Sequence, residues 1–259
     1  MANKNTKIAY YSPKWISRRL DDVIDSTIES IGCFCVDPVS NFIRSRILTP
    51  KTLIKFILGL QAHSLPGEIS DYFTSSDIDI PSVSAVSQRR DLLYPEIFKS
   101  INRRFLSSID NLSTLNGYYI LAQDDTQISY GQDSIVCQYH LNALYDCINH
   151  VFWGSRIDLP TKKSEVNALT DFINHRNYPE NSIITADRGY ESYNLIAHCI
   201  ENNQKFIFRV KDIDTKNGIL TSLSLPDEKF DITVTRTLTN VQTNEVKKNE
   251  NNQFVFVPS

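Results

Sequence analysis

The chain has 259 residues and a formal net charge of −3, from 27 Lys and Arg against 30 Asp and Glu. Hydrophobic residues make up 41% and charged residues 22%, so there is enough apolar material for a core and the composition excludes a disordered chain. No apolar run approaches the ~20 residues of a membrane-spanning helix, and residues 1–14 lack the apolar stretch of a secretory signal.

The number of cysteines and the distribution of charge bear on the cellular compartment and on the kind of partner. The five cysteines are odd in number and only Cys33 and Cys35 lie close together, which argues against a disulfide framework and favours the cytoplasm. We expect two buried thiols there rather than a metal site. Residues 1–110 hold 14 Lys and Arg against 12 Asp and Glu, with Arg doublets that fit either a phosphate-binding patch or ordinary solvated helix faces. Charge alone favours the solvated faces.

The first 110 residues read as helical. Apolar residues recur there at helical spacing, and Pro66 is expected to end the helix that starts at Pro50. Turn-forming residues over 75–81 come before the last two predicted helices. The predicted helices cover residues 21–31, 50–65, 82–93 and 95–109.

From Gly117 the pattern changes to short apolar and aromatic runs that alternate with amphipathic segments. Strands are predicted over 118–122, 137–145, 151–159, 182–186 and 205–211, and helices over 164–175 and 192–203. Three strands followed by alternation predict an α/β fold with a mixed sheet in ribonuclease-H-like order over residues 117–215. Residues 216–259 look like a partial β-rich insertion, with strands at 231–237 and 254–257.

Two carboxylates each follow an apolar strand, Asp124 and Asp187. Ligands gather at the carboxyl ends of strands in open α/β sheets, so the two side chains converge if the first and fourth strands are neighbours. Together they suit Mg²⁺ or Mn²⁺, and two such ions can drive phosphodiester cleavage. The alternative is that each Asp caps a turn. Arg188 fits either a DNA phosphate or the neutralisation of a neighbouring carboxylate.

Several stretches resemble bacterial DDE transposases of the insertion-sequence-four type. They are residues 122–126, 140–146, 185–194 and 208–212. The resemblance implies a ribonuclease-H-like catalytic core after a helical DNA-binding region at residues 1–110, and metal-dependent cleavage and strand transfer at transposon ends. It also implies double-stranded DNA as partner and a homodimer in the DNA complex. The implied metal ligands are Asp124 and Asp187, with Asp125 as a competitor, and the implied DNA contacts are Arg188, Tyr190 and Lys211.

The chain departs from this family at its C-terminal end. The family's third carboxylate lies in a pattern Tyr-x2-Arg-x3-Glu-x6-Lys, which does not occur here; Glu245 and Glu250 lie in a polar Lys/Asn-rich stretch, and Glu191 has no such role in the family. The chain is therefore expected to be truncated and weak or inactive alone. Two alternatives stay open: a non-catalytic DNA-binding or regulatory remnant, and a phosphohydrolase with Asp124 as nucleophile, which lacks the second spaced Asp of that chemistry.

Aromatic and histidine side chains are the remaining candidates for functional residues. Trp153, Tyr190 and Tyr193 fit either stacking on a flipped base or packing in the core, and packing is the commoner role. The histidines at 140, 150, 175 and 198 show no metal-ligand spacing and are expected to be structural or at the surface.

Overall fold

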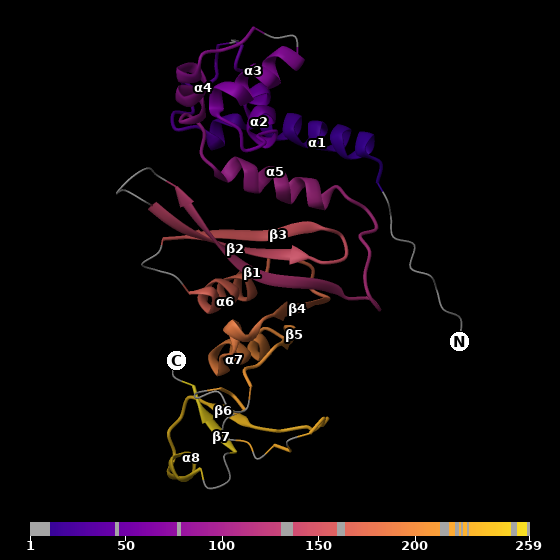
Figure 1. The fold of residues 1–259 in the computed structure, drawn as a ribbon, viewed down its shortest axis with the longest axis vertical. Helices are drawn as coiled ribbons and strands as arrows, with labels where there is room; N and C mark the ends of the chain where they lie inside the picture. The colour runs from indigo at the N-terminus through magenta and orange to yellow at the C-terminus, as the bar shows by residue number, and fades with distance from the viewer. Residues whose placement is uncertain are drawn as a thin grey trace, which may run out of the picture. The chain divides into compact units, whose positions relative to one another are not determined.

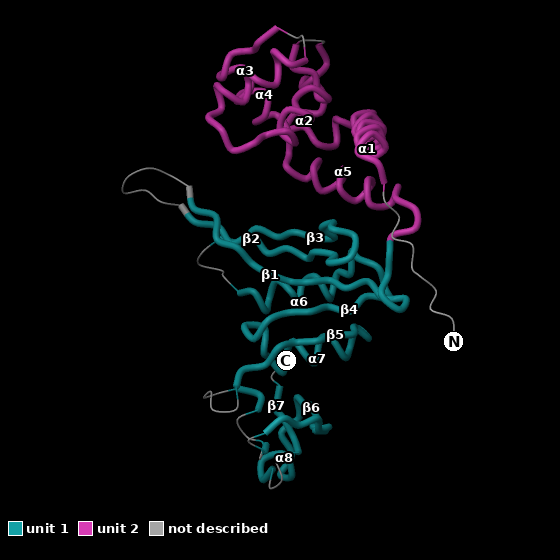
Figure 2. The backbone as a smooth tube through the Cα atoms, turned by 45° about the vertical axis from the view of Figure 1, so that its right-hand side comes forward, with its two compact units in different colours: residues 1–7, 113–259 teal, residues 8–112 magenta. Residues whose placement is uncertain are grey.

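A computed structural model divides the chain into two compact units, residues 8–112 and residues 113–259 together with 1–7 (Figure 2). Each unit has its own hydrophobic core. Across the described residues, none of the helices is long and apolar enough to cross a membrane. The structure describes residues 11–44, 47–76, 79–130, 137–159, 164–212, 218–220, 223, 225–226, 228–249 and 253–257.

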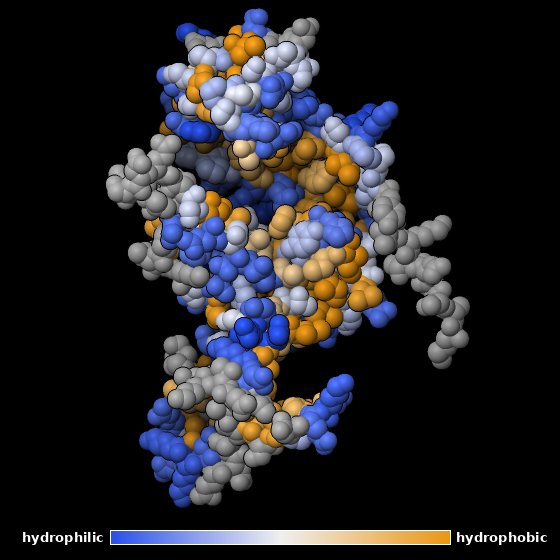
Figure 3. Space-filling model, in the orientation of Figure 1, coloured by the Kyte–Doolittle hydropathy of each residue, from blue (hydrophilic) through white to orange (hydrophobic). Residues whose placement is uncertain are grey.

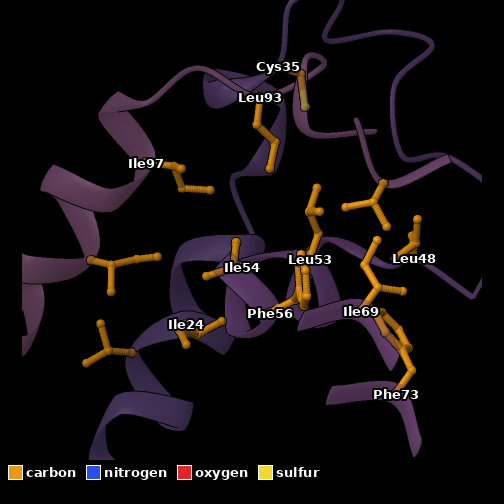
Figure 4. Packing of buried hydrophobic residues seen from close by; sticks show 13 residues of the cluster. Ile24, Cys35, Leu48, Leu53, Ile54, Phe56, Ile69, Phe73, Leu93 and Ile97 are labelled. Carbon is orange, nitrogen blue, oxygen red and sulfur yellow. The ribbon is translucent and has the colours of Figure 1, made fainter. Parts of the chain in front are cut away.

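The unit of residues 8–112 is a helical bundle, as predicted. Its core contains Ile24, Leu53 and Phe73, all fully buried (Figure 4). The helices, labelled in Figure 1, are α1 (Pro13–Ile28), α2 (Pro50–Leu58), α3 (Leu65–Ser75), α4 (Val83–Arg90) and α5 (Glu96–Ser107), with a short 3-10 turn at Ile31–Phe34.

Prolines begin helices in this unit rather than end them. Helix α1 begins at Pro13, earlier than predicted, because Ser12 caps it by accepting a hydrogen bond from the Trp15 amide. The prediction that Pro66 ends a helix is wrong: α2 ends at Leu58, and Pro66 lies in the first turn of α3, where its missing N–H costs nothing.

The loop before α3 is tied to the helix by a carboxylate. Glu68 Oε1 accepts hydrogen bonds from the amides of Gln61 and His63, each at 2.8 Å. The His63 amide is the larger cause that lowers the pKa of Glu68, partial burial opposes it, and the Gln61 amide adds to the lowering. The ionised carboxylate therefore stabilises the folded helical unit.

We expect Glu68→Gln to destabilise the helical unit near neutral pH. Because the folded-state pKa lies below the ordinary value of 4.5, the stabilisation is present above that pH and is lost as pH falls through the folded-state pKa. Urea unfolding followed by Trp15 fluorescence in a Trp153→Phe background measures this unit. The control is Glu29→Gln at the exposed end of α1. A Glu68→Gln deficit that is the same at pH 3 and pH 7 would contradict the assignment.

Cysteine burial differs from the prediction. Cys35 is buried at 2% exposure, whereas Cys33 is exposed, so the prediction of two buried thiols is wrong for Cys33. The four cysteines whose side chains the structure describes, at 33, 35, 147 and 199, are free. Burial raises the pKa of the Cys199 thiol to about 12, which keeps it protonated and inert.

The second unit contains the predicted mixed sheet, in the order β3-β2-β1-β4-β5. The pairs β1–β2 and β2–β3 are antiparallel, and β1–β4 and β4–β5 are parallel. This confirms the α/β fold in ribonuclease-H-like order. The elements are β1 (Tyr119–Tyr130), β2 (Cys137–Asp146), β3 (Val151–Asp158), α6 (Glu165–His175), β4 (Ser182–Ala186), a 3-10 turn (Arg188–Tyr190), α7 (Tyr193–Glu201) and β5 (Lys205–Phe208).

The C-terminal segment contains less strand than predicted. Strand β6 (Thr237–Thr239) pairs in parallel with β7 (Phe254–Phe256), and α8 (Asn244–Lys248) lies between them in the chain. The strand predicted over 231–237 is wrong for residues 231–236, which join no ladder. Their alternating apolar side chains, Ile232 and Val234, instead line a hollow of about 360 Å³ together with Ile196 and Ile200 of α7.

The two faces of the sheet differ. Helices α6 and α7 pack on the face that carries Leu121, Leu144 and Ile184. Hydrophobic residues also gather on the visible surface around the strands (Figure 3), and Phe152 and Ile207 are more than half exposed. Because side chains alternate along a strand, the residues of β1 next to Leu121 in sequence belong to the face away from α6 and α7.

Candidate active site

The candidate site lies where β1 runs past the end of β4. The two strands pair in parallel from Tyr119 with Ser182 to Ala122 with Thr185. Two positions further along the two strands are Asp124 and Asp187, so both carboxylates lie at the same end of this pair. Neighbouring strands are about 4.8 Å apart. The condition set by the sequence, that the first and fourth strands are neighbours, is met.

The surroundings of Asp124 differ from the sequence prediction. Asp124 does not end its strand: β1 continues to Tyr130 and pairs with β2 throughout, with Asp124 opposite Ala143. The side chain is exposed, and its Oδ1 accepts a hydrogen bond from the Asp125 amide at 2.9 Å. Alternation along β1 assigns Asp124 to the face away from α6 and α7. Its backbone is therefore fixed while its carboxylate reaches solvent.

Asp187 follows β4 directly, as predicted. It caps the 3-10 turn, and its Oδ1 accepts the amide of Gly189 at 2.6 Å. Asp187 both caps the turn and presents a carboxylate to solvent, because its side chain is exposed. The turn fixes one oxygen of Asp187.

Glycine is needed in this turn because two carboxylates approach it. A Cβ on Gly189 would lie 3.0 Å from Asp187 Oδ1 and 3.3 Å from Oε2 of Glu165, the first residue of α6. Asp187 and Glu165 thus share one small space at the end of the sheet, and a larger residue would push them apart. Glu165 is an acidic neighbour of the site that the sequence reasoning missed.

Asp125 faces the helix-covered side of the sheet and is engaged there. Its Oδ2 lies 3.3 Å from Nδ1 of His140, which is 5% exposed. On the same face Gln123 donates from Nε2 to the Tyr190 hydroxyl at 3.4 Å. Burial raises the pKa of Tyr190, the hydrogen bond from Gln123 opposes this, and the carboxylates of Glu165, Asp125 and Asp124 add to the rise. Asp125 and Asp124 therefore belong to opposite faces, and the expectation that His140 is structural agrees with its burial.

The three residues assigned to DNA contact differ in exposure. Arg188 is exposed beside Asp187. Tyr190 is 1% exposed, so its ring offers no surface for stacking on DNA and instead fills the core under the turn. Lys211 is partly buried, and its amide donates to Glu191 Oε2 at 2.7 Å. The other two aromatic candidates also pack in the protein: Trp153 against the sheet core, and Tyr193 against the C-terminal segment.

Glu191 attaches the segment after β5 to the core. Besides the Lys211 amide, its carboxylate accepts the amide of Ile219 through Oε1. Tyr193 adds two contacts: its hydroxyl donates to the Ile219 carbonyl at 3.4 Å and accepts from Arg236 at 2.9 Å. Sequence reasoning had no signal for this role, because the contacts span 20 or more residues and involve backbone groups.

We expect Glu191→Ala to free this segment. Hydrogen exchange at the amides of Lys211 and Ile219 should become at least about tenfold faster, because a lost charged hydrogen bond is worth ~1.5–3 kcal/mol. The measurement is hydrogen–deuterium exchange with mass spectrometry on the full chain. The control is Glu201→Ala at the exposed end of α7. Unchanged exchange at both amides would show that Glu191 does not hold the segment.

A further acidic residue in a family-like stretch has a structural role. Asp146 is fully buried at the end of β2. Its Oδ1 accepts the amides of Ile148 and Asn149, and its Oδ2 accepts Asn149 Nδ2 and the indole N–H of Trp153. The β2–β3 connection is therefore built around one carboxylate, which is not available to a ligand.

The donor set at the candidate site is two exposed carboxylates, which suits a hard cation. Within the described part of the chain, no group of three or more His, Cys, Asp and Glu side chains is close enough to hold a metal. Glu245 lies in α8, and Glu250 lies outside the described residues. Two carboxylates alone would leave most coordination positions of such a cation to other oxygen ligands.

Comparison with known proteins agrees with this geometry. No curated protein matches the chain. The family model described as "Transposase DDE domain" matches residues 115–254, which begin just before β1 and end at the first residue of β7. Members of this family generally use divalent metal ions. Since the match covers more than half of the chain, the protein belongs to the DDE transposase family.

Proposed function

We propose that the protein acts on the DNA ends of an insertion sequence of the insertion-sequence-four type and cleaves and joins phosphodiester bonds with Mg²⁺ or Mn²⁺. The observation that carries the proposal is the parallel pairing of β1 and β4, which puts Asp124 and Asp187 at one end of neighbouring strands. Carboxylate oxygens are the ligands that these ions prefer.

The roles of the residues follow from their positions. Asp124 would bind the metal from a fixed strand, and Asp187 would bind it through the oxygen that does not cap the turn. A bound metal would polarise the phosphate and activate a water or hydroxyl as the nucleophile. The exposed Arg188 would neutralise a phosphate beside Asp187. Tyr190, the last residue of the 3-10 turn, packs in the core. The backbone amide of Lys211 donates a hydrogen bond to Glu191.

The helical unit of residues 8–112 is the proposed DNA-binding region. Cleavage and DNA binding are tested together with a supercoiled plasmid that carries the DNA flanking the coding sequence. We expect weak nicking that requires Mg²⁺ or Mn²⁺, and binding that weakens steeply with salt because phosphate contacts release counterions. A chain with neither metal-dependent nicking nor salt-sensitive DNA binding would contradict the proposal.

A second candidate is a DNA-binding or regulatory protein without cleavage activity. The observation that favours it is that, among the residues that the structure describes, no three His, Cys, Asp or Glu side chains come close enough together to hold a metal. Binding to the flanking DNA without any metal-dependent nicking would select this candidate over the first.

A further inference from the structure

The ladder between β1 and β4 ends before it reaches the two aspartates of the candidate site. Its last pair is Ala122 with Thr185, so Asp124 and Asp187 each lie two positions beyond it. Past that pair, β1 stays attached to β2, whereas the chain after β4 enters the 3-10 turn that Asp187 caps. The strand pairing therefore does not by itself set the distance between the two carboxylates.

Hydrogen bonds through two buried residues join the two backbones beyond the end of this ladder. Gln123 is 4% exposed, and its Nε2 donates to the carbonyl oxygen of Asp124 and to the Tyr190 hydroxyl, each at 3.4 Å. Tyr190 is 1% exposed, and its amide donates to the carbonyl oxygen of Asp187 at 3.2 Å. The main chain of one aspartate is thus connected to the main chain of the other.

The orientation of the Gln123 amide is fixed by the groups that it faces. A carbonyl oxygen only accepts hydrogen bonds, so the nitrogen of the amide has to face the carbonyl of Asp124. The amide oxygen, Gln123 Oε1, is then buried without a hydrogen-bond partner among the described residues. An unpaired buried acceptor costs stability. This cost indicates that Gln123 serves a purpose other than stabilising the core.

A second buried glutamine–tyrosine pair in the same unit differs in this respect. Gln204 is also 4% exposed, and its Oε1 accepts a hydrogen bond from the Tyr178 hydroxyl at 3.0 Å. Its Nε2 donates to the carbonyls of Ser182 and Lys205, so both ends of this amide are paired. Ser182 begins β4, whereas the candidate site follows the other end of that strand. The pair of Gln204 and Tyr178 therefore has a structural role away from the site.

We propose that Gln123 and Tyr190 are positioning residues that set the spacing of the Asp124 and Asp187 carboxylates for a shared divalent cation. The inference rests on the proposed function, in which both carboxylates bind the metal. Without the cation the two negative charges repel each other, and Mg²⁺ requires ligands in near-octahedral positions at ~2.0–2.1 Å. A connection between the two backbones on the other face of β1 opposes the repulsion and holds the carboxylates in place for the ion.

The test is the affinity of the full chain for Mn²⁺, measured by electron paramagnetic resonance. Tyr190→Phe keeps the ring and removes the hydroxyl, and Gln123→Met keeps the length of the side chain and removes the amide. Groups that orient metal ligands typically contribute 10–100-fold to affinity, so each variant is expected to bind Mn²⁺ about tenfold more weakly. The double variant should bind no more weakly than either single variant, because all three remove the same contact.

Thermal unfolding separates positioning from packing. The double variant removes both partners of the contact together with the unpaired oxygen, and its side chains have similar shapes, so its unfolding midpoint should stay close to that of the wild type. The matched control is Tyr178→Phe, which removes the hydroxyl of the other pair. We expect this control to have a lower midpoint and unchanged Mn²⁺ affinity. If Tyr190→Phe does not fold, Gln123→Met provides the same test.

The outcomes separate this inference from the proposed function. If Asp124→Asn and Asp187→Asn weaken Mn²⁺ binding and the double variant does not, Gln123 and Tyr190 only pack, and the inference is overturned while the proposed function stands. A loss of affinity in Tyr178→Phe as large as in Tyr190→Phe also overturns it, because general loosening then explains both. If the wild type binds no Mn²⁺, or both Asp variants bind it as the wild type does, the proposed metal site fails first and the inference fails with it.

Discussion

Replacing Asp187 with Asn is expected to reduce metal-dependent DNA nicking by about 100-fold or more. Loss of groups that only orient metal ligands typically costs 10–100-fold, so loss of a proposed ligand should cost at least as much. Asparagine keeps an oxygen that can accept the Gly189 amide, so the 3-10 turn is retained. The change therefore removes the charge of the proposed ligand while the cap stays in place.

Binding of Mn²⁺ gives a readout that does not need an active enzyme. Electron paramagnetic resonance of Mn²⁺ titrated into the full chain should show weaker binding for both Asp187→Asn and Asp124→Asn. The matched control is Glu180→Gln, an acidic residue with a side chain 91% exposed in the loop before β4. Equal Mn²⁺ affinity in the wild type and both Asp variants would refute the metal assignment, whatever the nicking assay shows.

The largest loss of stability is expected from Asp146→Ala. This change removes the buried acceptor of four hydrogen bonds and leaves two backbone amides and the Trp153 indole N–H without it. An unsatisfied buried donor costs ~1–3 kcal/mol, so the free energy of unfolding of the sheet unit should fall by about 3–5 kcal/mol. Replacing an exposed catalytic Asp with Ala would instead leave the free energy of unfolding nearly unchanged.

The two tryptophans allow the two units to be followed separately, because Trp15 lies in α1 and Trp153 in β3. Urea unfolding of Asp146→Ala in a Trp15→Phe background reports the sheet unit alone. Asp146→Asn, which keeps one acceptor oxygen, should recover part of the loss, and Glu180→Ala serves as the surface control. A change below about 1 kcal/mol for Asp146→Ala would mean that the turn finds other partners.

The order of strands and helices was predictable because most elements are short, apolar and bounded by turn residues. The sheet strands 182–186 and 151–158 are of this kind, and so is the cap at Ser164. What failed were elements whose pattern depends on distant partners. Strand β1 runs on through polar residues because β2 pairs with it, although the apolar run ends at Ala122. Residues 231–236 alternate like a strand but have no ladder partner.

The candidate site was predictable in its acids and not in their surroundings. Two Asp residues after apolar runs, on strands that element order makes neighbours, point to one end of the sheet. The assignment of Tyr190 to DNA contact could not anticipate its burial, because aromatic residues serve cores and surfaces alike. Glu165 approaches Gly189 from another element, and Glu191 bonds backbone groups 20 and 28 residues away. Local sequence patterns do not predict such long-range contacts.

The hydrogen bonds that Glu191 accepts from main-chain amides have a consequence for which residues the chain tolerates. An amide N–H is common to every amino acid except proline, so the anchor recognises the path of the chain and ignores the identity of residues 211 and 219. These two hydrogen bonds therefore fix where the two ends of the intervening segment lie and place no requirement on the side chains between them. Proline at either end is the one replacement that this attachment forbids.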